Sequence, residues 1–252
     1  MGDLRQGDPA TLSQDLFETL PRSSQSPADE QAGAQEGTSG LGSGPHISVA
    51  DYEAGGIRVV CTSVDVTLDP ATAQSNLILS EDRKSVRHGD TRQDLPDNPE
   101  RFEPYVIVLG MEGFTGGRHY WEVEVGKKPE WTLGVCRDSV RRKGSISVTS
   151  ESGYFVVCLR DGEKYWARTS PLTRLPVSVR PRQVGVFLDY EAGEVSFYNV
   201  TDQSHLFTFT GTFSGMLRPY FSPCLNEGGK NADPLIIRPV PAPAGGNLGP
   251  CQ

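Results

Sequence analysis

The side chains that could do chemistry are spread along this 252-residue chain rather than gathered at catalytic spacing. Its four histidines, at positions 46, 88, 119 and 205, have no cysteine or carboxylate beside them at metal-ligand spacing. Glu122 and Glu124 could form a carboxylate pair, but they alternate with apolar residues, which predicts the solvated side of a half-buried strand. The sequence also has no nucleophile elbow, phosphate-binding loop or dinucleotide fingerprint. We therefore predict no catalytic residue, no metal site and no cofactor.

The five cysteines are odd in number and contain no C-x-x-C pair. This pattern predicts reduced thiols in a cytoplasmic or nuclear protein rather than a disulfide framework. No apolar run approaches 18 residues and no hydrophobic leader follows Met1, so we predict neither a membrane span nor a signal peptide.

The densest positive charge lies around residues 137–143, with Lys127 and Lys128 at the other end of the same predicted strand. One hypothesis is a contact with an anion or an acidic peptide, and the other is a solvated loop. The candidate anion-binding residues are Lys128, Arg137, Arg142 and Lys143. The net charge of −8 argues against nucleic acid as a partner.

Composition divides the chain into one domain and two loose ends. Residues 1–55 are acidic and rich in Ser, Gly and Pro, which predicts a disordered tail, and residues 241–252 predict a second flexible end. Within the tail, Thr11 to Leu20 places four apolar residues on one helical face. That stretch is either a short motif for a partner's groove or an incidental apolar cluster, and we favour the cluster.

From position 57 onward the sequence is typical of strands and turns. HYWEVEVG at 119–126 and WTLGVC at 131–136 alternate apolar with small or polar residues, and two hairpin turns are predicted at Asp161-Gly162 and at 191–193. The continuous apolar run from Tyr105 to Leu109 predicts a central, fully covered strand. Strands that recur every 8–15 residues predict an all-β, two-sheet antiparallel sandwich.

Four ordered motifs carry a resemblance to a known family. They are VTLDP at 66–70 with LSEDR at 79–83, HYWEVEVG at 119–126, LDYE at 188–191 with VSFY at 195–198, and RPYFS at 218–222 followed by PLII at 234–237. Together they resemble the PRY-SPRY domain of tripartite-motif ubiquitin ligases and butyrophilins, with ret-finger-protein-like members the most similar in character.

The resemblance implies a bent, concanavalin-like jelly-roll sandwich over residues 56–240, with PRY at about 62–110 and SPRY at about 111–240. It implies recognition of a protein or peptide on a concave sheet face, and no catalysis. Relatives carry a RING, a B-box and a coiled coil, and the first 60 residues here contain no matching ligand set or heptads. We therefore expect no intrinsic ligase activity, and ubiquitination only through a longer relative.

Alternation lets a binding face be proposed. Phe155, Val157 and Leu159 form one apolar set and are predicted to point inward with Trp131, Leu133 and Val135. The opposite set, with residues of the following strand and a later loop, is predicted to bind the partner. This set is Thr132, Tyr154, Val156, Cys158, Arg160, Lys164, Trp166, Leu225 and Asn226. Trp166 could instead be a core residue, and a butyrophilin-like sensor of a small phosphorylated ligand is the alternative function.

Overall fold

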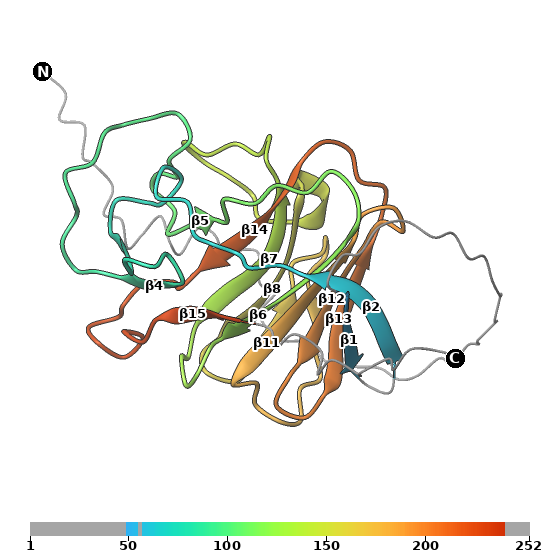
Figure 1. Cartoon of the computed structure of the whole chain (residues 1–252). Coiled ribbons are helices and arrows are strands. Elements are labelled where there is room, and N and C mark those ends of the chain that lie inside the picture. Colours follow the sequence, from blue (N-terminus) through green and yellow to red (C-terminus); the bar gives the residue numbers. More distant parts are fainter. Residues whose placement is uncertain (1–48, 55–56, 240–252) are drawn as a thin grey trace, which may run out of the picture.

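The computed structural model describes residues 49–54 and 57–239 (Figure 1). The predicted motif at Thr11 to Leu20 and the predicted C-terminal end lie outside the described residues. Residues 49–54 were assigned to the loose N-terminal segment, but they form strand β1 (Val49–Ala54), paired with β2 (Ile57–Ser63). Every other regular element in the described residues is a strand, apart from the 3₁₀ turn η1 (Ser150–Ser152). No helix of the described part is long and apolar enough to cross a membrane.

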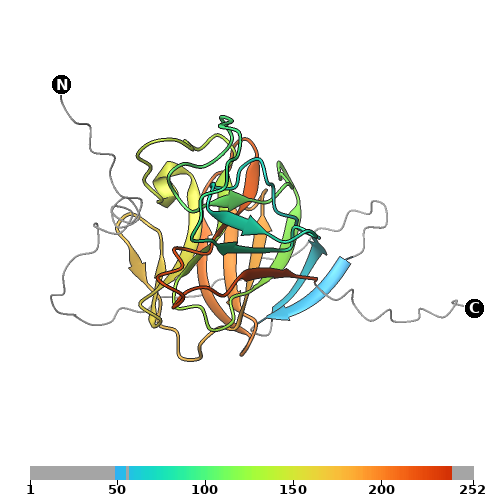
Figure 2. The ribbon, with the colours of Figure 1, turned by 90° about the vertical axis from the view of Figure 1, so that its left-hand side faces the viewer.

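The larger sheet has nine strands in the order β13-β12-β11-β6-β15-β4-β3, and the β1–β2 hairpin joins it through β2 and β6. Figure 2 shows this hairpin at the margin of the fold. All pairings in the sheet are antiparallel except β2 with β6. The remaining strands are β3 (Leu77–Leu79), β4 (Ser85–His88), β6 (Arg118–Glu124), β11 (Gln183–Asp189), β12 (Glu194–Asn199), β13 (Ser204–Thr210) and β15 (Leu235–Arg238).

The smaller sheet has six antiparallel strands in the order β10-β9-β8-β7-β14-β5. Both predicted hairpins are confirmed: β8 pairs with β9 across Asp161-Gly162, and β11 pairs with β12 across 190–193. The strands are β5 (Val108–Leu109), β7 (Trp131–Arg137), β8 (Tyr154–Arg160), β9 (Lys164–Ala167), β10 (Thr173–Arg174) and β14 (Leu217–Ser222).

The two sheets enclose the main hydrophobic core. Trp121 and Val123 of β6 pack there with Leu133 of β7 and Val157 of β8, and all four are at most 1% exposed. The predicted inward set, including Trp131, Val135, Phe155 and Leu159, is confirmed by its membership of this core. The all-β sandwich predicted from the strand pattern is likewise confirmed.

A second, smaller core covers the outer face of the six-stranded sheet, the face turned away from the main core. Tyr105, Ile107 and Leu109 belong to this second core, whereas Val106 and Val108 between them belong to the main one. The apolar run at 105–109 is therefore continuous because both of its sides are buried. It is covered as predicted, but it is not a central strand: only Val108–Leu109 form β5, at the edge of the sheet.

The prediction for Glu122 was wrong. Its side chain is 5% exposed and accepts hydrogen bonds from the Tyr120 hydroxyl, at 2.9 Å, and from the Gln183 amide. Glu124, two residues on, is half-buried and ion-paired with Arg238. The polar face of β6 is thus covered at Glu122, where partners replace the water that a carboxylate needs.

Candidate functional site

Strand register assembles one row of side chains across the outer face of the six-stranded sheet. Thr132 of β7 lies opposite Ser222 of β14 on one side and Cys158 of β8 on the other. Cys158 in turn lies opposite Trp166 of β9, and Trp166 lies opposite Arg174 of β10. Directly opposed residues share a face of the sheet. The row therefore crosses β14, β7, β8, β9 and β10, of which β10 lies at the edge of the sheet.

Trp166 is the large aromatic of this row. Its ring is half-buried and belongs to neither hydrophobic core, so it is not the core residue that the sequence allowed as an alternative. Its indole Nε1 is shielded from solvent and finds no hydrogen-bond partner among the described residues. A shielded indole N–H normally has an acceptor, but the Nε1 of the core residue Trp131 also has none among the described residues, so this N–H alone does not mark a binding site.

Arg160 lies next to the row and is held by hydrogen bonds to its neighbours. Its guanidinium donates to the carbonyls of Trp131, at 2.8 Å, and Leu159, and to the Thr132 hydroxyl at 2.9 Å. Arg160, Thr132 and Cys158 are 8%, 4% and 2% exposed. These three predicted binding residues thus form the base of the face, while Lys164, exposed and paired with Asp161 at 2.8 Å, stands at its rim.

Tyr154 and Val156 were predicted to line the same open face, but the second core covers them. Both belong to that core, at 2% and 0% exposed, where the Tyr154 ring meets the Tyr220 ring edge-on. Burial raises the pKa of the Tyr154 hydroxyl well above its ordinary value. Alternation placed them on the correct side of β8, and it carried no information about the distant 102–109 segment that packs over them.

Leu225 and Asn226 lie in the loop between β14 and β15, and their contacts lead away from the row. Leu225 packs against the main core. Asn226 donates from its amide nitrogen to Asp90, at 2.8 Å, and from its backbone to His88. The structure therefore connects Asn226 to the segment at β4 and Leu225 to the main core, and none of these contacts joins them to Trp166.

The predicted anion-binding residues do not form one cluster. Arg142 is bonded to Asp138 at 2.8 Å and lies over the Phe102 ring, while Lys143 pairs with Asp97 at 2.6 Å. Arg137 lies at the end of β7 against Gly153. Lys128 has a different partner, the carbonyl of Asn231. Arg142 and Lys143 thus each have a carboxylate partner, although Asp138 also pairs with Arg218 and the Lys143–Asp97 pair is exposed to water.

Lys128 is nevertheless unusual, since its side chain is only 1% exposed and its ammonium donates to the carbonyl of Asn231 at 2.9 Å. Removal from water lowers the pKa of Lys128 to about 8, against smaller opposing effects of Cys224, Asp233 and Glu130. The bond to Asn231 anchors the 223–234 loop. We assign Lys128 to this loop rather than to an open anion site.

Sequence reasoning missed Arg174, the exposed residue opposite Trp166. A two-residue strand at a sheet edge has no alternation to detect, so only the register in three dimensions reveals it. Over residues 57–239, no group of three or more His, Cys, Asp or Glu side chains could hold a metal ion.

The comparisons with known proteins agree with the fold. Residues 66–114 match the SPRY-associated domain (PRY) and residues 118–235 match the SPRY domain. The chain is 57% identical over 174 residues to the human erythroid membrane-associated protein and 57% identical over 179 residues to the human zinc finger protein RFP. These matches cover 69% and 71% of this chain but only 37% and 35% of the two relatives.

Among solved structures, the TRIM65 PSpry domain superposes with a TM-score of 0.60 at 26% identity, over 70% of this chain and 90% of that domain. The chain thus spans about a third of the curated relatives' length and nearly the whole of a solved PRY-SPRY domain. Two adjoining family matches, the shared fold and relatives above 50% identity lead to one assignment: the chain belongs to the PRY-SPRY family.

Proposed function

We propose that this protein is a non-catalytic recognition module that binds a protein or peptide on the outer face of its six-stranded sheet, around Trp166. The observation that carries the proposal is the half-buried Trp166 ring, which lies outside both hydrophobic cores with the exposed Arg174 opposite it. Tryptophan and arginine are the residues most enriched at the energetic centres of protein interfaces. Arg174 beside the ring supplies the second of these types.

In this proposal the partner packs an apolar group against the Trp166 ring and offers a carbonyl or carboxylate to Arg174. Lys164 contributes at the rim, where its pair with Asp161 is exposed to water and exchanges readily. Thr132, Cys158 and Arg160 form the base of the same face, with Cys158 directly opposite Trp166. The base is rigid because Arg160 bonds two carbonyls and a hydroxyl, which limits the entropy lost on binding.

We extend the proposal to the activity and the cellular location of the protein. We expect no enzymatic activity from this chain, and a link to ubiquitin transfer only where a longer relative supplies a catalytic RING. We place the protein in the cytoplasm, with the nucleus as an alternative. Support comes from Cys136, Cys158 and Cys224, which are free and buried in this fold. We favour recognition of a protein over the phosphate-sensor alternative, because Arg142 and Lys143 each have a carboxylate partner and Lys128 bonds elsewhere, to Asn231.

The test compares partner capture by proximity labelling in cells for the wild-type chain and two variants, Trp166→Ala and Arg174→Glu. Met111→Ala is the matched control, because Met111 is 50% exposed outside this face. We expect both face variants, but not the control, to lose the same set of labelled proteins while their thermal unfolding stays unchanged. Identical labelling by all four folded proteins would contradict the proposal.

A further inference from the structure

Strand β3 ends the nine-stranded sheet, and no other strand of the described residues pairs with its outer edge. The register with β4 places Leu79 opposite Val86 and Ile78 opposite Arg87. Hydrogen bonds from Ser80 to Ser85 and from Gly89 to Asn76 define the alternation of bonded pairs along this ladder. By that alternation the backbone groups of Leu77 and Leu79 point away from β4, toward the free edge.

The edge is closed at Leu77 and open at Leu79. The Leu77 N–H donates to the carbonyl of Gln74 at 2.8 Å, and the Gln93 side-chain amide donates to the carbonyl of Leu77. Gln93 thus occupies the place of a neighbouring strand at this residue. Among the described residues no backbone or side-chain contact of that kind covers Leu79. A donor and an acceptor on an uncovered edge form a template for another extended chain.

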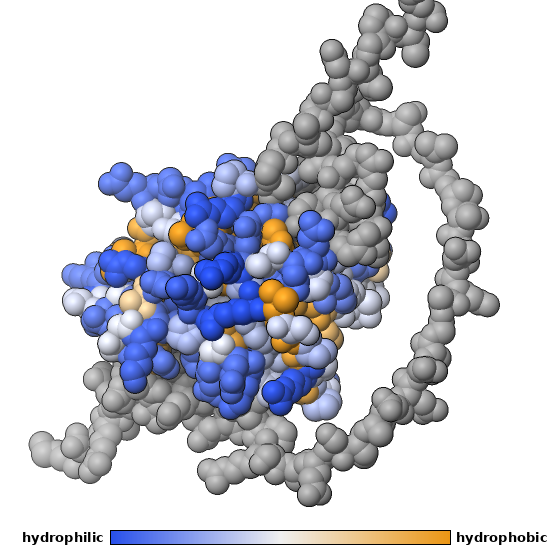
Figure 3. All heavy atoms as spheres, turned by 90° about the horizontal axis from the view of Figure 1, so that it is seen from below, coloured by the Kyte–Doolittle hydropathy of each residue, from blue (hydrophilic) through white to orange (hydrophobic). Residues whose placement is uncertain are grey.

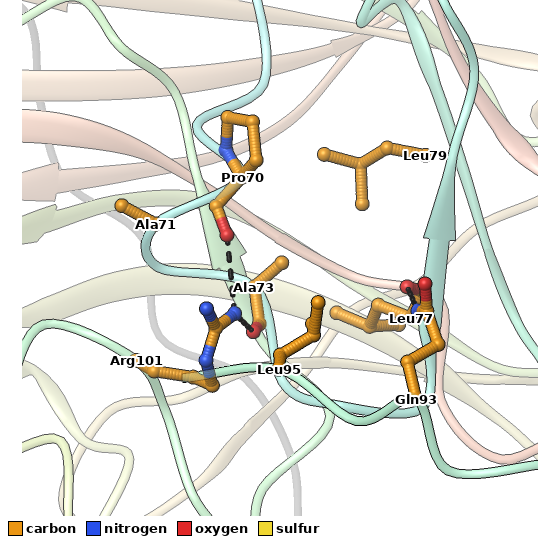
Figure 4. Close-up of a pocket in the computed structure, with 8 residues that line it drawn as sticks. All are labelled: Pro70, Ala71, Ala73, Leu77, Leu79, Gln93, Leu95 and Arg101. Atoms are coloured by element: carbon orange, nitrogen blue, oxygen red, sulfur yellow. Dashed lines mark hydrogen bonds between the residues drawn. The ribbon is translucent and has the colours of Figure 1, made fainter. Parts of the chain in front are cut away.

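A pocket of about 370 Å³ adjoins this edge and lies within the size range of ligand sites. Figure 4 shows the side chains of Leu77 and Leu79 facing Pro70 and Ala73 across the pocket, with Leu95 below. Leu77 is 2% exposed and forms the buried end, whereas Leu95 is 38% exposed and stands at the surface. The pocket therefore presents an apolar wall that opens beside a free strand edge.

The polar residues of the pocket are already engaged by the backbone. The Arg101 guanidinium donates to the carbonyls of Pro70, at 3.1 Å, and Ala73. Its Nε donates to the carbonyl of Pro96 at 3.2 Å. The arginine therefore holds the turn that contains Pro70 and Ala73 against the 96–101 segment. The Gln93 side-chain amide is likewise engaged, since it donates to the carbonyl of Leu77. With these groups engaged, the pocket favours an apolar group rather than an anion.

We propose that the β3 edge is a second recognition site, which takes an extended peptide segment of another protein. The peptide backbone pairs with the N–H and C=O of Leu79, and one apolar side chain enters the pocket beside Leu95. Strand addition gains affinity from main-chain hydrogen bonds and specificity from pockets for alternate side chains. Both components stand next to each other here, on the PRY segment and apart from the Trp166 row of the smaller sheet.

The test uses the full 252-residue chain and a phage-displayed library of ten-residue peptides as the probe. Enriched peptides are synthesised and titrated against the wild type, Leu95→Asp, Leu79→Pro and the control Val179→Asp, since Val179 is 43% exposed elsewhere. Proline removes the Leu79 donor at an edge position that tolerates it. We expect Leu95→Asp and Leu79→Pro each to weaken binding by about tenfold or more, and the control by less than about twofold.

Hydrogen exchange of the Leu79 amide in the wild type keeps the test decisive if Leu79→Pro does not fold. Bound peptide should slow that exchange. The proposal is overturned if no enriched peptide depends on Leu95, or if Trp166→Ala, titrated with the same peptides, loses binding instead. It is equally overturned if the Leu79 amide stays unprotected in the complex, or if the edge turns out to pair two copies of this chain in sedimentation experiments.

Discussion

Asp69 and Arg218 are 149 positions apart in sequence, yet the Arg218 Nη2 lies 2.7 Å from the Asp69 Oδ2. The aspartate belongs to the LDP motif of the PRY segment, and the arginine begins the RPYFS motif of the SPRY domain. Arg218 also donates to the carbonyl of Gly110 at 2.9 Å and reaches Asp138 at 3.3 Å. Two of the family motifs thus meet in one ion pair that joins the PRY segment to β14.

We expect Asp69→Asn to lower the free energy of unfolding by roughly 3 kcal/mol, because it leaves a buried arginine without its nearest carboxylate. The side chains of Asp69 and Arg218 are 16% and 9% exposed, so water has little access to solvate the guanidinium once the carboxylate is lost. The amide oxygen of asparagine can still accept from the Ala71 N–H, which keeps the turn and isolates the ion pair. Urea denaturation monitored by tryptophan fluorescence measures the difference.

Asp97→Asn is the matched control, since it breaks a pair with Lys143 in which the aspartate is 89% exposed. We expect it to cost less than about 1 kcal/mol. Equal effects of the two substitutions would show that the Asp69–Arg218 pair stabilises the fold no more than an exposed ion pair does.

The inner side of the fold was predictable from the sequence because alternation reports a local property. Phe155, Val157 and Leu159 all point into the main core as their period-2 spacing requires. The hairpin at Asp161-Gly162 was predictable for the same reason: both residues have positive φ, at 53° and 74°, and their types are those that such a turn favours.

The outer side was not predictable, since it depends on which distant segment covers each residue. Tyr154 and Cys158 have the same orientation on β8, yet Tyr154 is packed in the second core and Cys158 is not. The covering residues Phe102 and Ile107 are about fifty positions earlier in the chain. Alternation gives the side of a strand but not the neighbour on that side.

We expect Gly134→Ala to destabilise the protein by at least about 3 kcal/mol, because neighbouring backbone leaves no space for a methyl group. Gly134 lies in β7 with a φ of 152°, and a Cβ there would stand 2.2 Å from the carbonyl oxygen of Phe155. Gly126→Ala is the control: Gly126 also has a positive φ, of 54°, but no neighbouring atom of the described residues lies within 4 Å of a Cβ added there. We expect it to cost about 1–2 kcal/mol, and similar thermal shifts of the two variants would contradict the steric explanation.

The buried Lys128 predicts a specific pH dependence of stability. Its pKa is about 8 in the folded protein and about 10.5 in the unfolded chain, so between these values the unfolded chain binds more protons. The lysine's contribution to stability therefore rises with pH across this window and is constant below pH 8. The full change is on the order of 3 kcal/mol.

Lys128→Met isolates this contribution, because burial also raises the pKa of the Cys136 thiol to about 12, which lowers stability at high pH. We expect the unfolding free energy of the wild type minus that of Lys128→Met to become more favourable to the wild type from pH 8 to 10. Lys127→Met, at the exposed neighbouring position, should show no such trend. A difference that is flat with pH would mean that Lys128 is solvated in the folded protein.

The predicted face can be separated into residues that bind and residues that support. Arg160→Glu removes three hydrogen bonds to Trp131, Leu159 and Thr132 and puts a carboxylate in their place. We expect it to cost roughly 3 kcal/mol of stability, as for other buried hydrogen-bonded charges. A loss of partner binding by this variant would therefore not show that Arg160 itself contacts the partner. Trp166→Ala removes a half-buried ring outside both cores.

For Trp166→Ala we expect a loss of stability below about 1.5 kcal/mol, together with a loss of partner affinity of about 2 kcal/mol or more. Denaturation of both variants, followed by titration with any partner identified through the proximity experiment, measures the two quantities. The contrast decides between the roles of Trp166. If Trp166→Ala lowers stability as much as Arg160→Glu and leaves affinity intact, the ring supports the sheet, and recognition must lie on another surface.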